Sequence, residues 1–166
     1  MMGSMEIHLR PVGHVTSTRR EIGDDDWDRE RATIELDATR FGPDALLGLD
    51  AFSHVEVVFL FDRVPLESVE HGARRPRGNP DWPLVGIFAQ RAKDRPNRLG
   101  LTTCRLLAVD GLTIQVHGLD AVDGTPVLDI KPCMAEFAPR GTVRQPAWSS
   151  DLMSGYWGEE PAGDRE

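Results

Sequence analysis

The sequence lacks the short motifs that mark the common nucleotide-binding and hydrolytic folds. Its 166 residues contain no G-x-x-x-x-G-K-[ST] phosphate loop, no G-x-G-x-x-G, no H-E-x-x-H and no G-x-S-x-G. Each of these patterns carries a mechanism, such as backbone amides around a phosphate or two histidines on a metal ion. A nucleotide-like ligand would therefore have to be held by the backbone and side chains of loops at the rim of a sheet or barrel.

Long apolar runs and cysteine-rich patterns are also missing. No stretch is apolar over a length that spans a bilayer, and residues 1–6 have neither a basic start nor an apolar segment. Cys104 and Cys133 lack metal-ligand spacing, and the three adjacent aspartates at 24–26 do not form a cage. We therefore expect a cytoplasmic protein with reduced thiols, no metal and no membrane partner.

Long amphipathic helices are absent between residues 6 and 132. Alternating apolar and polar residues, separated by turns, instead predict a mainly β fold, an antiparallel β-barrel with few short helices. The length suits a single domain over residues 7–157, with flexible ends at 1–6 and 158–166. The expected strands cover residues 7–15, 32–36, 52–61, 104–109, 112–119 and 125–132, and a short helix is expected at 149–153.

Prolines and glycines refine this prediction. Pro11 interrupts the first strand, and the Asp110-Gly111 pair indicates a hairpin between two alternating runs. Prolines bracket the strand at 125–132, which predicts a sheet edge or a barrel rim. The proline-rich stretch 64–83 is predicted to be a loop, and a loop of that length in a compact domain is uncommon unless it is functional or disordered.

The net charge of −8 hides one basic segment. Residues 74–98 contain seven Lys or Arg and two Asp, a net charge of +5 against −13 for the rest of the chain. A general nucleic-acid coat protein would be basic overall, whereas one basic segment in an acidic protein fits a single localised anionic partner. The alternative is a pair of solvated loops.

The stretch 86–102 overlaps this basic segment. It is apolar at 86–89, carries cations through the middle and turns apolar again at 99–101, a pattern that predicts a strand, a charged loop and a second strand. Pro96 fixes its own φ and restricts Arg95 to an extended conformation. The Arg95 side chain should therefore leave the loop in a defined direction.

Four ordered motifs resemble the TsaA-like family, also called TrmO. They are P-V-G-H-V-x-S from Pro11, L-G-L-D-A-F-S-H from Leu47, G-I-F-A-x-R-x-x-x-R-P-N-x-L-G-L from Gly86 and L-D-A-V-D-G-T-P-V-L-D-I-K-P from Leu119. The resemblance covers residues 9–132. It implies a homodimeric β-barrel methyltransferase that uses S-adenosylmethionine to methylate N6 of the threonylcarbamoyl-modified adenosine beside the tRNA anticodon.

The resemblance also implies which residues bind the methyl donor. They lie in two rim stretches, with Gln90, Arg91, Arg95, Pro96, Asn97, Leu99 and Gly100 in the first and Asp123, Thr125, Val127 and Lys131 in the second.

The acceptor and the RNA need further groups. The donor's sulfonium already activates its methyl group, so the acceptor nitrogen is the partner whose N–H needs orienting. Asp129 is the catalytic candidate, and an ion pair of Asp129 with Lys131 or Arg95 is the structural alternative. The cations predicted to contact RNA are Arg74, Arg75, Arg77, Lys93 and Arg98.

Two other functions stay open at this point. The chain could be an S-adenosylmethionine-binding regulatory module, or a methyltransferase for a small molecule. Binding of the donor and methylation of tRNA are the two properties that distinguish these readings.

Overall fold

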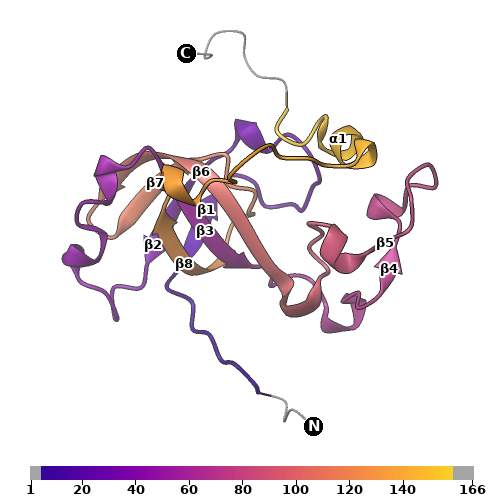
Figure 1. Cartoon of the computed structure of the whole chain (residues 1–166). Helices are drawn as coiled ribbons and strands as arrows, with labels where there is room; N and C mark the ends of the chain where they lie inside the picture. Colours follow the sequence, from indigo (N-terminus) through magenta and orange to yellow (C-terminus); the bar gives the residue numbers. More distant parts are fainter. Residues whose placement is uncertain (1–4, 159–166) are drawn as a thin grey trace.

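The computed structural model describes residues 5–158, which form a closed barrel beside a small second sheet (Figure 1). Six antiparallel strands close the barrel in the order β1-β2-β7-β6-β3-β8, which confirms the predicted fold class. The barrel strands are β1 (Gly13–Ser17), β2 (Arg31–Leu36), β3 (His54–Leu60), β6 (Leu99–Asp110), β7 (Thr113–His117) and β8 (Pro126–Pro132), and the small sheet consists of β4 (Ala73–Arg74) and β5 (Val85–Gly86).

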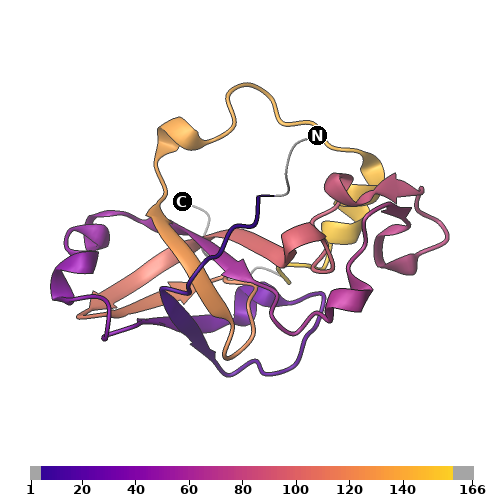
Figure 2. The ribbon, with the colours of Figure 1, turned by 90° about the horizontal axis from the view of Figure 1, so that it is seen from below.

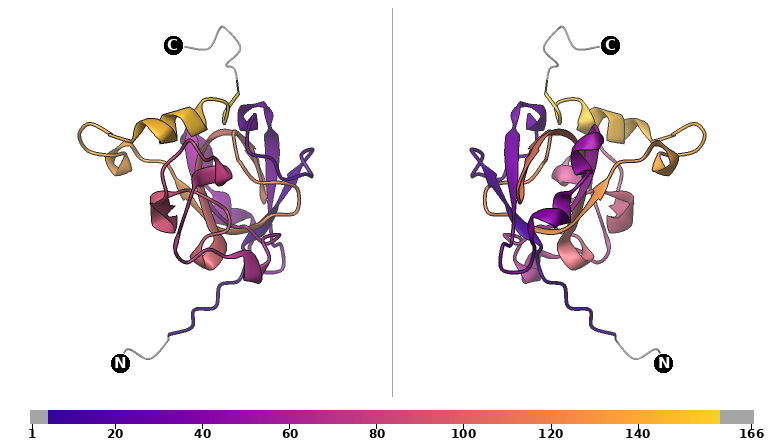
Figure 3. Two further views of the ribbon diagram at one scale, coloured as in Figure 1. Left: turned by 90° about the vertical axis from the view of Figure 1, so that its right-hand side faces the viewer. Right: turned by 90° about the vertical axis from the view of Figure 1, so that its left-hand side faces the viewer.

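Helical structure is short throughout the described part of the chain. The one α-helix within residues 5–158, α1 (Ala147–Met153), lies outside the ring of strands (Figure 3) and begins two residues before the predicted start. None of the described helices has the length and apolar character to cross a membrane. The 3₁₀ turns are Trp27–Arg29, Pro43–Leu46, Leu49–Ala51, Leu66–Ser68, Pro76–Gly78, Ile87–Ala89, Pro96–Arg98 and Ala135–Phe137.

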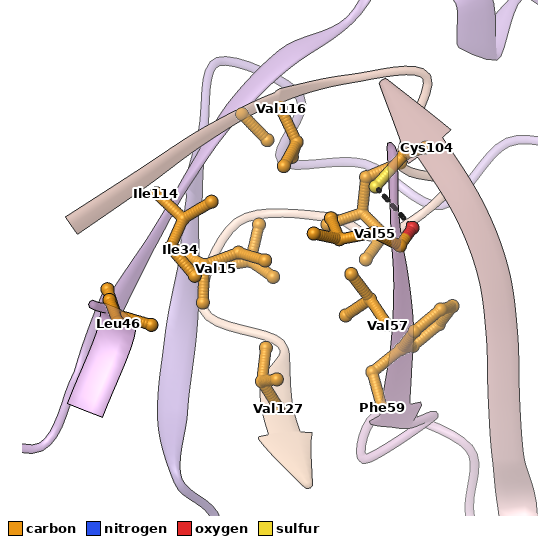
Figure 4. Close-up of a cluster of buried hydrophobic side chains, with 13 residues drawn as sticks. Val15, Ile34, Leu46, Val55, Val57, Phe59, Cys104, Ile114, Val116 and Val127 are labelled. Carbon is orange, nitrogen blue, oxygen red and sulfur yellow. Dashed lines mark hydrogen bonds between the residues drawn. The ribbon is translucent and has the colours of Figure 1, made fainter. Parts of the chain in front are cut away.

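The hydrophobic core fills the barrel interior. Val55, Val57 and Phe59 of β3 alternate with outward residues and are at most 1% exposed. Figure 4 shows these side chains converging with those of the other barrel strands. The strand predicted at 52–61 is therefore confirmed as β3, whose successive side chains point alternately into and out of the barrel.

β8 closes the barrel between β1 and β3. Its Val127 pairs with Gly13 on one side and with Phe59 on the other. Because both sides of β8 are paired within the closed barrel, the prediction of a sheet edge is wrong, and the alternative of a barrel rim stays a prediction. Pro126 and Pro132 are the first and last residues of the strand, where a missing N–H interrupts the ladder least.

The first strand begins at Gly13 rather than at residue 7. Ile7 and Leu9 are 72% and 63% exposed, so the apolar residues before Pro11 pack on no strand. The predicted strand is therefore wrong for residues 7–12. The predicted flexible ends, 1–6 and 158–166, fall mostly outside the described residues.

The stretch 86–102 contains one barrel strand, not two. Val85–Gly86 pairs with β4, and Ile87–Ala89 then forms a 3₁₀ turn. Ile87 is buried in that turn and its N–H donates to the carbonyl of Gly72 at 2.9 Å. The predicted first strand is wrong because a local turn, not a strand face, buries the apolar residue. The second predicted strand is confirmed as β6.

The proline-rich stretch 64–83 is organised by short elements. It contains Leu66–Ser68, β4 and Pro76–Gly78. Together with β5 and the loop that follows it, residues 65–98 form a unit beside the barrel, at the right of Figure 1, which we call the side module. The hairpin predicted at Asp110-Gly111 is confirmed, with Gly111 at a φ of +58° between β6 and β7.

The C-terminal segment returns to the barrel after a long excursion. Residues 133–146 arch away from the strands (Figure 2) before α1 begins. Residues 155–157 then lie against the loop at 26–28, because their three carbonyls accept hydrogen bonds of 3.1, 2.9 and 2.9 Å from the N–H groups of residues 26, 27 and 28.

Gly100 provides a test of core packing. A Cβ at this position would lie 2.4 Å from Cε2 and Cζ of the Phe59 ring. We predict that Gly100→Ala lowers the free energy of unfolding by about 1–3 kcal/mol, the usual cost of overpacking a core. Urea denaturation measures the loss. Gly86→Ala is the matched control, since a Cβ there meets no atom within 4 Å. Equal midpoints for the two variants would contradict the prediction.

Candidate functional site

The two stretches predicted to bind the donor lie at the same end of the barrel. The corner at 61–64, which follows β3, connects them. On one side the N–H of Phe61 donates to the carbonyl of Arg98 at 2.8 Å, and Arg98 Nη1 donates to the carbonyl of Val64 at 2.8 Å. On the other side Arg63 Nη2 donates to the carbonyl of Asp123 at 2.7 Å. The loop at 90–98 and the turn at 123–125 are thus fixed to one corner.

The loop at 90–98 is anchored from within. Gln90 is buried, and its side-chain amide donates to the carbonyls of Arg74 and Val85 at 3.1 and 3.0 Å. The carbonyl of Gln90 accepts a 2.7 Å hydrogen bond from Arg95 Nη1. Arg95 therefore does have a defined direction, towards its own loop. Gln90 and Arg95 shape the loop, and Pro96 begins its closing turn.

The end of this loop has an unusual backbone. Asn97 and Arg98 have φ values of 63° and 50°, in the left-handed region. Asn enters this region readily, whereas a long side chain such as that of Arg does so at a cost of about 1 kcal/mol or more. Such strain persists only where the surroundings impose it, and the carbonyls that bind the Arg98 guanidinium are part of those surroundings.

Arg91 lies against the first half of β6. Its Nη2 donates to the carbonyl of Leu101 at 2.5 Å, and the side chain is exposed. Leu99 and Leu101 are 37% and 48% exposed on the outer face of the same strand, whereas Gly100 between them faces the core. A cation next to exposed apolar side chains gives this surface an amphipathic character.

The turn at 123–125 is held by internal contacts. Asp123 Oδ1 accepts a 3.0 Å hydrogen bond from the N–H of Ser17, and Thr125 Oγ1 donates to the carbonyl of Val122 at 2.7 Å. Thr125 is buried, and Val127 lies fully in the core. Any contact of Val127 with a ligand is therefore limited to its backbone.

Asp129 and Lys131 form an ion pair on the outer face of β8. Lys131 Nζ lies 2.7 Å from Asp129 Oδ2, and the hydrogen bond raises the pKa of the lysine. Both side chains are about half exposed. Of the two roles left open for Asp129, the structure contains the ion pair, with Lys131 rather than Arg95 as the partner. The N–H of Ile130 donates to Asp129 Oδ1 at 3.0 Å.

The cations predicted to contact RNA differ in their surroundings. Arg74 forms a two-point ion pair with Asp94, and Arg77 pairs with Asp25 at 2.9 Å. Arg75 is exposed and donates to the carbonyl of Trp82. Lys93 is exposed and makes no hydrogen bond or ion pair within residues 5–158. Arg98, described above, is bound to carbonyls of the corner at 61–64.

Sequence reasoning missed one cluster near this site. The Asp120 carboxylate accepts hydrogen bonds from Thr102 Oγ1 and from the phenol of Tyr156. Burial raises the pKa of Tyr156 above its usual range, and the negative charge of Asp120 adds to the shift. Burial likewise raises the pKa of Cys104 to about 12. No local pattern joins residues 120 and 156, so only the folded chain brings them together.

The described residues offer no candidate metal centre. Across positions 5–158 no group of three His, Cys, Asp or Glu side chains is placed to hold an ion. Of the adjacent aspartates at 24–26, Asp25 pairs with Arg77, and Asp26 lies 3.8 Å from Arg29.

Comparisons with known proteins agree on one family. The family model described as tRNA-methyltransferase O N-terminal domain matches residues 24–138. A human protein named tRNA (adenine(37)-N6)-methyltransferase is 40% identical over 110 residues, which cover 66% of this chain and 24% of the human protein. This chain thus spans about a quarter of that relative's length.

Two further relatives cover more of the chain. A protein of Methanothermobacter thermautotrophicus, named "Probable S-adenosyl-L-methionine-binding protein", is 39% identical over 136 residues, which cover 79% of this chain and 93% of the archaeal protein. A crystal structure of TrmO from Pseudomonas aeruginosa superposes with a TM-score of 0.71 at 29% identity, covering 89% of this chain and 64% of that one. Motifs, barrel and matches together show that the chain belongs to the family of the tRNA-methyltransferase O (TrmO) N-terminal domain.

Proposed function

We propose that the protein is an S-adenosylmethionine-dependent methyltransferase that methylates N6 of the adenosine, in its threonylcarbamoyl-modified form, beside the tRNA anticodon. The observation that carries the proposal is the meeting of the loop at 90–98 and the turn at 123–125 at one corner of the barrel, in a chain of the TrmO family. The names of the human and archaeal relatives support the acceptor and the donor respectively. A cytoplasmic location is part of the proposal, because tRNA is the proposed substrate.

The residues present fit the chemistry of the donor. S-adenosylmethionine carries a carboxylate, an ammonium group and an adenine ring, and when bound it supplies an activated methyl group on a sulfonium. Arg91 engages Leu101 through one nitrogen and has further N–H groups for a carboxylate. The exposed Leu99 and Leu101 side chains offer an apolar surface for the ring, and Asn97, two residues before Leu99 in the chain, is also exposed.

The protein's task is then to position the acceptor and take its proton. An exocyclic amine has its lone pair delocalised into the ring, so its N–H must be oriented as the new N–C bond forms. Asp129 is the group we propose for this role. Its ion pair with Lys131 and its bond from Ile130 leave acceptor capacity, because a carboxylate has about four lone-pair sites.

Phosphate contacts are proposed for the side module. Arg74 and Arg77 are neutralised by Asp94 and Asp25, so of the five predicted cations Arg75 and Lys93 have the most charge to offer a phosphate. Arg98 contributes by holding the loop rather than by reaching the RNA.

We further propose that the protein is a homodimer in which residues 133–146, which we call the arm, pack against a second copy. This arm extends away from the barrel and carries Phe137 and Val143, which are 80% and 65% exposed. Packing these two side chains against a second copy would remove their apolar surface from water.

The first prediction for this function is methyl transfer to tRNA. Unmodified and threonylcarbamoylated tRNA are each incubated with the protein and S-adenosylmethionine, and nucleosides are analysed by mass spectrometry. We expect one added methyl group, on the anticodon-adjacent modified adenosine.

Arg91→Lys should weaken donor binding in calorimetry about tenfold or more, because a lysine cannot make the two-point bond to a carboxylate.

The control for that variant is Arg31→Lys, which changes an exposed cation on β2. Donor binding without any transfer would favour a regulatory module, and transfer to a small molecule alone would favour the other alternative. If the protein neither binds the donor nor transfers a methyl group, the proposal is contradicted.

A second prediction concerns RNA affinity. The double variant Arg75→Gln/Lys93→Gln should bind tRNA more weakly, and the slope of log affinity against log salt should flatten by about one for each lost phosphate contact. Filter binding at several salt concentrations measures the slope. The matched variant Arg31→Gln/Arg105→Gln removes the same charge from exposed barrel positions. Identical slopes for the two variants would refute the role of the side module.

A third prediction concerns the dimer. Sedimentation equilibrium should give twice the 18.4 kDa of one chain, and Phe137→Asp should shift the protein towards the monomer. Leu66→Asp alters a similarly exposed residue, 72% accessible against 80% for Phe137, outside the arm and should leave the mass unchanged. A wild-type monomer at micromolar concentration would contradict the prediction.

A further inference from the structure

The half of β6 nearest the loop at 90–98 has a strand on one side only. Residues 99–103 pair with β3, while the pairing with β7 begins further along β6. Here the carbonyl of Leu101 accepts the bond from Arg91, and the next residue, Thr102, donates its hydroxyl to Asp120. The Arg91 guanidinium and the Asp120 carboxylate are therefore hydrogen-bonded to adjacent residues of β6.

Arg91 and Asp120 nevertheless do not pair. Among the ion pairs of residues 5–158, none joins these two side chains. Both oxygens of Asp120 are already engaged, Oδ1 by the hydroxyl of Thr102 and Oδ2 by the phenol of Tyr156. Arg91 is bound to Leu101 and Asp120 to Thr102, so both charged groups are held at the same stretch of β6. Two neutral hydroxyl groups thus hold the acid beside an unpaired arginine.

Tyr156 is itself held firmly and from elsewhere in the chain. Its carbonyl accepts a 2.9 Å hydrogen bond from the N–H of Trp27, the central bond of the three that hold residues 155–157. Its ring packs edge to face on Trp157, with centroids 5.0 Å apart. The position of the phenol is set by the C-terminal segment, which lies beyond the residues 24–138 that the family model matches.

We propose that Tyr156 is a positioning residue of the donor site: with Thr102 it occupies both oxygens of Asp120 and so keeps Arg91 available for an anionic ligand. The inference rests on the proposed function, in which that ligand is the carboxylate of S-adenosylmethionine. If the phenol is removed, Oδ2 of Asp120 loses its donor. Arg77 is already bound to Asp25, whereas Arg91, held on the residue next to Thr102, has no carboxylate partner among residues 5–158. Arg91 is then drawn from the ligand to Asp120.

The variant Tyr156→Phe deletes only the phenol oxygen. We expect the dissociation constant of S-adenosylmethionine, measured by calorimetry, to rise about tenfold, the scale of one lost charge-assisted hydrogen bond. Thr102→Val frees the other oxygen of Asp120 and should have a similar effect. It serves as the second variant if Tyr156→Phe fails to fold.

Rescue separates positioning from simple support of the fold. In Tyr156→Phe/Asp120→Asn the neutral amide cannot pair with Arg91, so affinity should return to within about threefold of the wild type. A purely structural role predicts that the second substitution leaves affinity as low or lowers it further, and that result would overturn the inference. If the wild type binds S-adenosylmethionine and Tyr156→Phe has the same dissociation constant, the inference is overturned while the proposed function stands. Absence of binding to the wild type would refute the proposed function and this inference with it.

The contact itself has a spectroscopic readout, because Tyr156 is the one tyrosine in the sequence. Burial and Asp120 raise its pKa, while Arg91 and Arg77 oppose the shift. Because the pKa of Tyr156 is raised in the folded state, the protonated phenol contributes to the stability of the fold. That contribution is complete below the ordinary tyrosine pKa of about 10 and is lost as pH rises. Phenolate absorbance should therefore appear only when the protein unfolds in alkali. Ionisation of the folded protein near the ordinary value would contradict the Tyr156–Asp120 contact.

Discussion

Closure of the six-stranded barrel is the constraint on which the site depends. β8 must pair with β1 and β3 at once, and this fixes the turn at 123–125 beside the loop after β1. The corner after β3 lies at the same end, where Arg98 binds the carbonyl of Val64 in the corner and Arg63 of the corner binds the carbonyl of Asp123. Two stretches separated by more than twenty residues are therefore positioned by strand pairing and a few guanidinium–carbonyl bonds, without a nucleotide-binding motif.

The basic segment shows why a sequence charge is not a surface charge. Residues 74–98 carry a net +5, yet Arg74 is paired with Asp94 inside the segment and Arg77 with Asp25 far outside it. Other arginines bind backbone carbonyls and brace loops. A guanidinium can do this because its several N–H groups fit carbonyls at the end of a turn. The cations of the segment are thus divided between those that brace loops or pair with carboxylates and those, such as Lys93, that face solvent.

The surroundings of Asp120 include a residue that lies outside the matched domain. Residues 24–138 contain the loop at 90–98 and Asp120, but the phenol that engages Asp120 comes from residue 156. The C-terminal segment is tied to the loop at 26–28 by backbone bonds, whose geometry does not depend on the side chains there. A family domain and a segment outside the match therefore meet at one carboxylate.

The sequence by itself determined the barrel, the strand at β3, the hairpin at Asp110-Gly111 and the family, because these depend on local periodicity, turn residues and ordered motifs. Tertiary structure alone decided that Asp129 pairs with Lys131, that residues 87–89 form a turn, and that Tyr156 reaches Asp120. The last contact joins groups 36 residues apart. Local patterns specify which face of a strand is buried, whereas the partner of a polar side chain depends on which distant segment the closed barrel brings to it.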